Sequence, residues 1–107
     1  MSPKEQRLCA VDDMKSGEAR RFDVGHHRIC VVRIGDDFYA LGDRCTHADI
    51  SLSEGEVYED EREIECWKHG STFSLETGEP QSLPATKAEP VYDVRVEGAD
   101  VILRVPK

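Results

Sequence analysis

The chain has 107 residues, enough for one domain with a modest hydrophobic core and too few for two. Its formal net charge of −8 repels nucleic-acid phosphates and anionic membrane surfaces, so neither is expected as a partner. No apolar stretch approaches the roughly 20 residues of a membrane span, and the N-terminal segment lacks the apolar region of a signal peptide. These features predict a soluble, cytoplasmic, single-domain protein.

Short segments rich in branched and aromatic residues, separated by turn residues, predict β-strands along most of the chain. The expected strands lie at residues 7–10, 20–24, 28–34, 38–41, 63–66, 72–75, 90–96 and 101–105. The last two are joined across residues 97–100, which have the composition of a hairpin turn. Residues 12–18 are expected to form a single helical turn, capped by Asp12 or Asp13 and ended by Gly17. The predicted fold class is all-β.

Two short motifs each combine one cysteine and one histidine. Cys45 and His47 are two residues apart, so in a locally extended loop both side chains point the same way. Cys66 and His69 are three residues apart, which brings them to one side of a tight turn, and Gly70 follows where the backbone must bend sharply. The 18 residues between His47 and Cys66 suffice for a hairpin that returns the two loops side by side. Four such ligands predict either zinc or an iron-sulfur cluster.

The pairing of ligand types favours the cluster over zinc. Structural zinc modules pair like ligands within each loop, as in C-x-x-C with H-x-x-x-H, whereas here each loop is mixed. A two-iron cluster with cysteine on one iron and histidine on the other needs one ligand of each kind from each loop. A Cys2His2 zinc-binding interaction module remains the alternative.

The segments CTHADISLSEG (45–55) and ECWKHGSTFSLETG (65–78) resemble the two cluster-binding boxes of the Rieske iron-sulfur family. They are most similar to those of the soluble Rieske ferredoxins that serve ring-hydroxylating oxygenases. The resemblance implies a single Rieske domain over residues 1–107, with a basal antiparallel β-sandwich formed by about 1–42 and 87–107. A small cluster-binding subdomain, at about 43–86, is inserted into that sandwich.

The resemblance also implies one [2Fe-2S] cluster per chain and a set of ligands for it. On this analogy Cys45 and Cys66 hold the buried iron, and His47 and His69 hold the outer iron near the surface. Pro84 lies in the segment 83–86, where the family has a proline-containing loop that covers the cluster.

The residues beside the second box indicate a reduction potential at the lower end of the Rieske range. The Ser71 hydroxyl is expected to donate to a bridging sulfide, but Phe73 stands where high-potential respiratory members have a tyrosine. Those members also carry a bracing disulfide, and Asp49, Ile50 and Lys68 stand in the regions of its two cysteines. We expect a reduction potential of about −150 mV for the cluster.

The resemblance implies a one-electron carrier between an NAD(P)H-dependent flavin reductase and a terminal Rieske oxygenase that acts on aromatic rings. The chain itself is then not an enzyme, and a monomer is expected. Partners are expected to dock at the histidine edge, where Trp67, Lys68, Ala48, Pro84 and Ala85 are candidates, with steering by the acidic surface. The alternatives are a Rieske-like subunit associated with nitrite reductase or a carrier in iron-sulfur assembly.

The other residues able to carry chemistry are given structural roles. Cys9 and Cys30 lie in strand-like segments and are expected to be small core residues. His26 and His27 follow Gly25 in an expected turn and are predicted to be exposed and unliganded. The seven acids of residues 54–65 are expected to form a solvated face of a hairpin.

Overall fold

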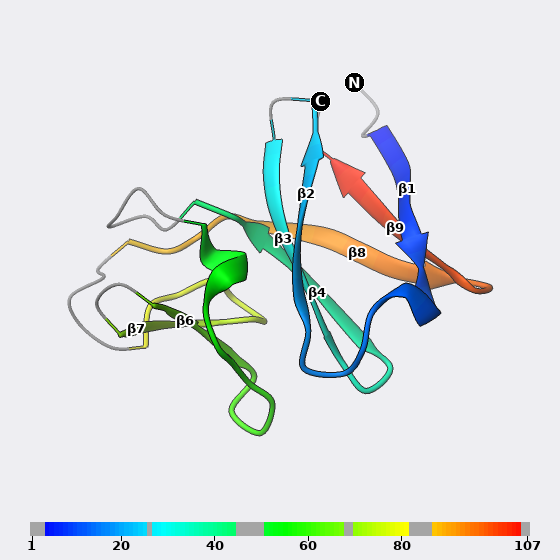
Figure 1. Cartoon of the computed structure of the whole chain (residues 1–107). Helices are drawn as coiled ribbons and strands as arrows, with labels where there is room; N and C mark the ends of the chain where they lie inside the picture. The colour runs from blue at the N-terminus through cyan, green and yellow to red at the C-terminus, as the bar shows by residue number, and fades with distance from the viewer. Residues whose placement is uncertain (1–3, 26, 45–50, 68–69, 82–86, 106–107) are drawn as a thin grey trace.

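The computed structural model describes residues 4–25, 27–44, 51–67, 70–81 and 87–105. Within these ranges the chain is built from antiparallel β-strands with two short 3₁₀ helices (Figure 1), which confirms the all-β class. The elements are β1 (Lys4–Ala10), η1 (Val11–Asp13), β2 (Ala19–Val24), β3 (His27–Ile34), β4 (Asp37–Gly42), η2 (Leu52–Glu54), β5 (Val57–Tyr58), β6 (Glu63–Cys66), β7 (Ser71–Ser74), β8 (Val91–Glu97) and β9 (Asp100–Val105).

The larger sheet has six strands in the order β1-β9-β8-β4-β3-β2. Its two halves are joined at a single short ladder, where β4 and β8 pair only at Ala40–Tyr92 and Leu41–Val91. The smaller sheet, β5-β6-β7, lies to one side together with η2 (Figure 1). This arrangement sets the half formed by β2, β3 and β4 between the smaller sheet and the half formed by β1, β8 and β9.

Strand β3 is the shared wall of two hydrophobic cores. Its residues Cys30, Val32 and Ile34 pack in one core with η2 and strands β6 and β7. Ile29 and Val31 point to the other face and pack with residues of β1 and β9. A strand buried on both faces reads as a continuous apolar run, which explains the sequence ICVV in its middle. Burial on both faces of β3 therefore ties the smaller sheet to the rest of the fold.

All eight expected strands are present, with ends shifted by a few residues. The largest shift is in β1, which begins at Lys4, three residues earlier than expected, and pairs with β9 along its length. Strand β5 was not expected, because it contains only Val57 and Tyr58 within the acidic segment. Five of the seven acids in that segment are exposed, which fits the prediction of a solvated face. The division of the chain at residues 43 and 87 stays a prediction.

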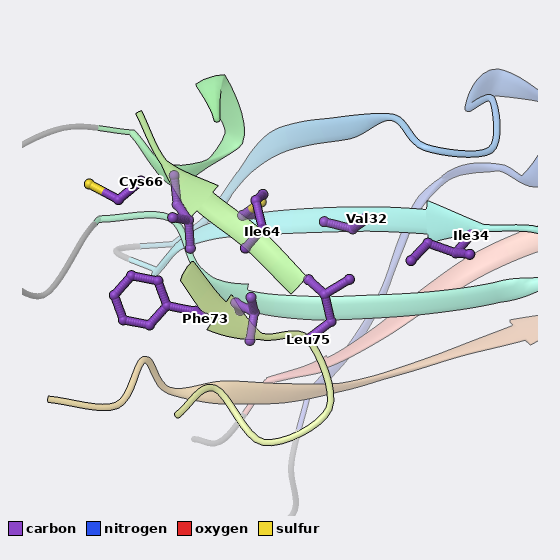
Figure 2. Packing of buried hydrophobic residues seen from close by; sticks show 9 residues of the cluster. Val32, Ile34, Ile64, Cys66, Phe73 and Leu75 are labelled. Carbon is purple, nitrogen blue, oxygen red and sulfur yellow. The ribbon is translucent and has the colours of Figure 1, made fainter. Parts of the chain in front are cut away.

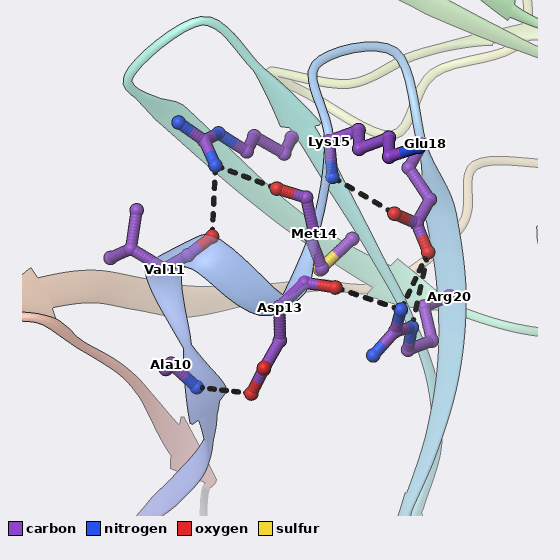
Figure 3. A network of polar contacts seen from close by, with 8 residues as sticks. Ala10, Val11, Asp13, Met14, Lys15, Glu18 and Arg20 are labelled. Atoms are coloured by element: carbon purple, nitrogen blue, oxygen red, sulfur yellow. Dashed lines mark hydrogen bonds and ion pairs between the residues drawn. The ribbon is translucent and has the colours of Figure 1, made fainter.

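The helical turn was expected at the wrong place. It is the 3₁₀ helix η1, which spans Val11–Asp13, and Asp13 caps it by accepting a hydrogen bond from the backbone N–H of Ala10 at 2.9 Å. Two arginines from neighbouring strands donate hydrogen bonds to carbonyl oxygens of this segment (Figure 3). Arg33 donates to the carbonyl oxygens of Val11 at 2.8 Å and Met14 at 2.6 Å, and Arg20 donates to that of Asp13 at 2.9 Å. These contacts with β2 and β3 end the turn before Gly17 is reached.

One histidine prediction is also corrected. His27 is not in an exposed turn but begins β3, where it is half-buried. Its Nδ1 lies 3.3 Å from the hydroxyl of Tyr92 on β8. His26 lies outside the described residues. No helix in the described ranges has the length and apolar character needed to cross a bilayer.

The tip of the β5–β6 hairpin is fastened to the larger sheet. Arg62 there has a positive φ of 57°, a conformation that costs a non-glycine residue free energy. Its guanidinium lies 3.2 Å from the Asp37 carboxylate and 3.1 Å from the Tyr39 hydroxyl, both on β4. On the other side of the tip, the Ser16 hydroxyl donates to Glu59 at 2.8 Å. These contacts hold the smaller sheet against the larger one.

Candidate metal centre

Cys66 is the last residue of β6 and is fully buried. It belongs to the core cluster that includes Ile64, Phe73 and Leu75. Figure 2 shows its sulfur pointing beyond the end of β6, away from Val32 and Ile34. The thiol thus lies at the end of the core, and the core residues would shield one side of a group bound to it from water.

The register of β6 and β7 brings Ser71 next to Cys66. The two residues are directly paired, as are Ile64 and Phe73 two residues along the ladder. Directly opposed residues of antiparallel strands have their side chains on the same face, with Cβ atoms about 4.5–5.5 Å apart. All four side chains are fully buried, so they share the inner face of the smaller sheet. The Ser71 hydroxyl is therefore a neighbour of the Cys66 sulfur, as a donor to the same bound group must be.

The turn between Cys66 and Ser71 depends on Gly70. Its N–H donates to the Cys66 carbonyl oxygen at 2.9 Å, and its φ is 77°, a value that L side chains rarely adopt. Among the described residues, and apart from its chain neighbours, no heavy atom lies within 4 Å of the position that a Cβ of Gly70 would take. The expected sharp bend at Gly70 is confirmed.

The first motif is bracketed by described residues. Arg44 and Ser51 form an isolated antiparallel bridge, one on each side of Cys45 and His47. Next to that bridge, Asp43 is fully buried and accepts hydrogen bonds from Ser51 and Ser53. The sequence placed Asp43 only in a turn. The pattern that could have revealed it is a carboxylate just before the ligand pair with two serines just after it.

The segment that contains Pro84 is bracketed in a similar way. Before it, the N–H of Gln81 donates to the carbonyl oxygen of Thr72 on β7 at 2.7 Å. After it, the N–H of Glu89 donates to the carbonyl oxygen of Gly78 at 2.8 Å. A Cβ on Gly78 would lie 2.2 Å from the Glu89 carbonyl oxygen, so this approach requires glycine. Both ends of the segment are thus held beside β7.

The structure therefore brings together two of the predicted site residues, Cys66 and Ser71. The other four, Cys45, His47, His69 and Pro84, lie outside the described residues, as do the docking candidates Lys68, Ala48 and Ala85. The complete ligand set stays a prediction. In the described part of the chain, no group of three or more His, Cys, Asp or Glu side chains is arranged to hold a metal.

Cys9 and Cys30 are buried in the core, as predicted. Burial raises the pKa of the Cys30 thiol, and the nearby Asp43 and Glu89 carboxylates add to the rise. Burial also raises the pKa of Cys9, with a smaller contribution from Asp13. A raised pKa favours the protonated thiol, whereas metals bind the thiolate.

Comparisons with known proteins agree with this geometry. The family model described as "Rieske [2Fe-2S] domain" matches residues 4–100. The 3-phenylpropionate/cinnamic acid dioxygenase ferredoxin subunit of Escherichia coli (strain K12) is 41% identical over 99 residues, which is 92% of each chain. The ferredoxin of carbazole 1,9a-dioxygenase from Nocardioides aromaticivorans IC177 superposes over 100% of both chains, with a TM-score of 0.91 and 36% identity. A chain in a complex of reduced oxygenase and oxidized ferredoxin of carbazole 1,9a-dioxygenase aligns over 96% of this chain and 95% of its own, with a TM-score of 0.87 and 41% identity.

The described residues fit a cluster of this kind. A cysteine sulfur is the soft donor that iron-sulfur clusters require, and Cys66 supplies it from a buried strand end. Ser71 supplies a hydroxyl on the same face. The donor chemistry and the burial are those of a protein-bound cluster.

Proposed function

Because the chain belongs to the Rieske [2Fe-2S] domain family, we propose that it is a one-electron carrier between an NAD(P)H-dependent flavin reductase and a terminal oxygenase that acts on aromatic rings. Its cofactor is a Rieske [2Fe-2S] cluster. The observation that carries the proposal is the 41% identity, over 92% of each chain, to a dioxygenase ferredoxin subunit. That likeness favours this role over nitrite-reductase association, iron-sulfur assembly or a zinc module.

We assign the cluster ligands to the two motifs. Cys45 and Cys66 would hold the inner iron, and His47 and His69 the outer iron. The burial of Cys66 at the end of β6 supports the inner position for its thiolate. The bridge between Arg44 and Ser51 supports a closed loop around the first pair. When bound, a cluster with two histidine ligands takes up and releases one electron at a higher potential than an all-cysteine cluster.

We assign the tuning of the potential to Ser71 and Phe73. The Ser71 side chain lies on the same face as the Cys66 sulfur, so its hydroxyl can donate to a cluster sulfur. The buried ring of Phe73 has no hydroxyl and can donate nothing. One hydroxyl donor, without a bracing disulfide, supports a potential near about −150 mV.

Partner proteins would dock where Trp67 extends from the surface directly after Cys66. This side chain is 52% exposed, which is high for a large aromatic residue, and exposed aromatic residues are enriched in protein interfaces. The net charge of −8 favours partners with basic surfaces and speeds the encounter at low ionic strength. Lys68, Ala48, Pro84 and Ala85 would complete a small, transient interface.

We infer that the chain is not itself an enzyme and works as a cytoplasmic monomer. The protein that it resembles over 92% of each chain is named a ferredoxin subunit of a dioxygenase, which supports the role of an electron carrier. The cysteines Cys9, Cys30 and Cys66 are free thiols in the structure, which suits a reducing compartment.

The test is spectroscopic and then functional. The protein, purified without air and reduced with dithionite, should give a rhombic EPR signal with a low average g value. It should then take electrons from NADH through a flavin reductase and support turnover by a ring-hydroxylating oxygenase. A colourless protein that contains zinc and no acid-labile sulfide would refute the proposal. A genuine Rieske signal without transfer to any such oxygenase would favour another redox pathway.

A further inference from the structure

Asp43 follows the last residue of β4 and is one of the few polar residues buried in the described part of the chain. Its side chain has no exposed surface. Burying a carboxylate is costly unless hydrogen bonds and a nearby positive charge compensate for lost water. The Arg21 Nε lies 3.8 Å from the Asp43 Oδ2 and supplies that positive charge. The hydrogen bonds come from residues that flank the first motif.

Asp43 uses both its side chain and its backbone to fix this region. Oδ1 accepts a hydrogen bond from the N–H of Ser53 at 2.9 Å, and Oδ2 accepts one from the hydroxyl of Ser51. Its carbonyl oxygen accepts from the N–H of Leu52 at 2.5 Å. Its own N–H donates to the carbonyl oxygen of Arg28 on β3 at 2.8 Å. One residue thus joins both ends of the segment to the larger sheet.

The far end of this segment is also fixed to the second motif. Leu52 is fully buried and packs in the same core cluster as Cys66 and Phe73. Asp43 and residues 51–53 flank the segment that contains Cys45 and His47. The contacts of Asp43 therefore fix both flanks of that segment relative to the core that contains Cys66.

An apolar residue could not replace these contacts. It would avoid the cost of burying a charge, but it would leave the Ser53 N–H and the Ser51 hydroxyl without the acceptors they now have. Ser51 also lies 2.8 Å from the hydroxyl of Ser53, so one carboxylate orders both side chains. The Asp43 carboxylate thus acts as a clamp, which holds Ser51 and Ser53 in one arrangement.

We propose that Asp43 is a positioning residue for the metal centre, which closes the loop of Cys45 and His47 and fixes its placement against Cys66. The inference rests on the ligand assignment proposed above. It adds a residue that binds no metal and acts only through the loop.

The test compares Asp43→Ala, Asp43→Asn and Ser51→Ala in the cluster-loaded protein. Asp93→Ala is the control, since it removes an exposed carboxylate from β8. Amide hydrogen exchange at Ser53 reports the clamp itself. The EPR g values and the rate of cluster loss to a chelator report the ligand geometry.

In Asp43→Ala the Ser53 amide should exchange about 10- to 100-fold faster, the g values should shift and the cluster should be lost faster by a similar factor. Asp43→Asn should restore most of the protection, because its amide oxygen can still accept from Ser53. Asp93→Ala should match the parent protein. If Asp43→Ala does not fold, the serine variant carries the test, with a smaller effect of the same sign.

Rates of exchange and of cluster loss within twofold of the parent, together with unchanged g values, in Asp43→Ala or Ser51→Ala would overturn the inference. Faster exchange with unchanged g values and cluster loss would also overturn it, because Asp43 would then stabilise the chain without positioning the ligands. Failure of the ligand assignment is visible separately. A Cys45→Ser variant that kept an unaltered cluster would refute the assignment, whatever the exchange at Ser53.

Discussion

Replacing Ser71 by alanine should lower the reduction potential of the cluster without altering the fold. Ser71 is fully buried and paired with Cys66, so its hydroxyl lies on the same face as this proposed ligand. A hydroxyl that donates to a sulfur stabilises the reduced cluster more than the oxidised one, because reduction adds a negative charge next to the acceptor. Removing this donor makes the added electron less stable.

The size of the effect follows from the hydrogen bond. A bond to a charged acceptor contributes about 1.5–3 kcal/mol, and we take about half of this as the preference for the reduced state. For a one-electron couple about 1.4 kcal/mol corresponds to about 59 mV. The potential of Ser71→Ala should therefore fall by roughly 30–60 mV. Solvent will not reduce this value much, since Ser71 has no exposed surface.

Redox titration followed by EPR measures the shift directly. Ser74→Ala is the matched control, because it makes the same change on the same strand at a half-exposed position opposite Glu63. It should leave the potential unchanged. A Ser71→Ala potential within about 10 mV of the parent, or an equal shift in the control, would show that the Ser71 hydroxyl does not act on the cluster.

Three further substitutions test other parts of the structure. Gly55→Ala should lower stability by about 1–3 kcal/mol or more in denaturant unfolding, because its Cβ would lie 1.6 Å from a β6 carbonyl oxygen; an unchanged midpoint would contradict this packing. Cys66→Ala should abolish cluster binding in an iron and sulfide assay, whereas Cys30→Ala should retain it, and equal loss in both would argue against the ligand assignment. Trp67→Ala should slow reduction by the flavin reductase by about tenfold in stopped-flow measurements, whereas Val96→Ala, on the other sheet, should not; equal rates would remove Trp67 from the docking surface.

The strands could be predicted from the sequence because local signals agreed with the tertiary fold. The C-terminal hairpin combines apolar segments with a turn at Gly98 and Ala99, and its register follows from that turn. Strand β5 could not be found in this way, because two residues within an acidic segment are too few to show the alternation of apolar and polar residues that marks a strand. The 3₁₀ helix η1 was misplaced because Arg33 on β3 and Arg20 on β2 bind carbonyl oxygens in and directly after this helix and so decide where it ends. Such contacts are set by the fold and not by local propensity.

The type of cluster could be predicted from the sequence, but the contacts around the first motif could not. The mixed order of Cys and His within each loop favoured an iron-sulfur cluster over zinc, and the match to the Rieske [2Fe-2S] domain confirms the type of cluster, whereas the ligand set stays a prediction. The burial of Asp43 does not follow from local propensity, because it depends on hydrogen bonds with Arg28 on β3 and with Ser53 on the far side of the first motif. An aspartate after a glycine is usually a solvated turn residue, and only the tertiary contacts distinguish this one.

The fold separates holding the cluster from tuning it. Each of the three segments proposed to surround the cluster is fastened at both ends by backbone hydrogen bonds to a strand or its extension, at Asp43, Gly70 and Gly78. Because these bonds come from the main chain, the side chains of Ser71 and Phe73, on β7, can change without breaking them. Asp43 differs, because its side chain adds two further hydrogen bonds, from Ser51 and Ser53. Changes at Ser71 and Phe73 should therefore shift the potential, whereas changes at Asp43 should shift the geometry, and the two kinds of variant should be distinguishable by potential and by g values.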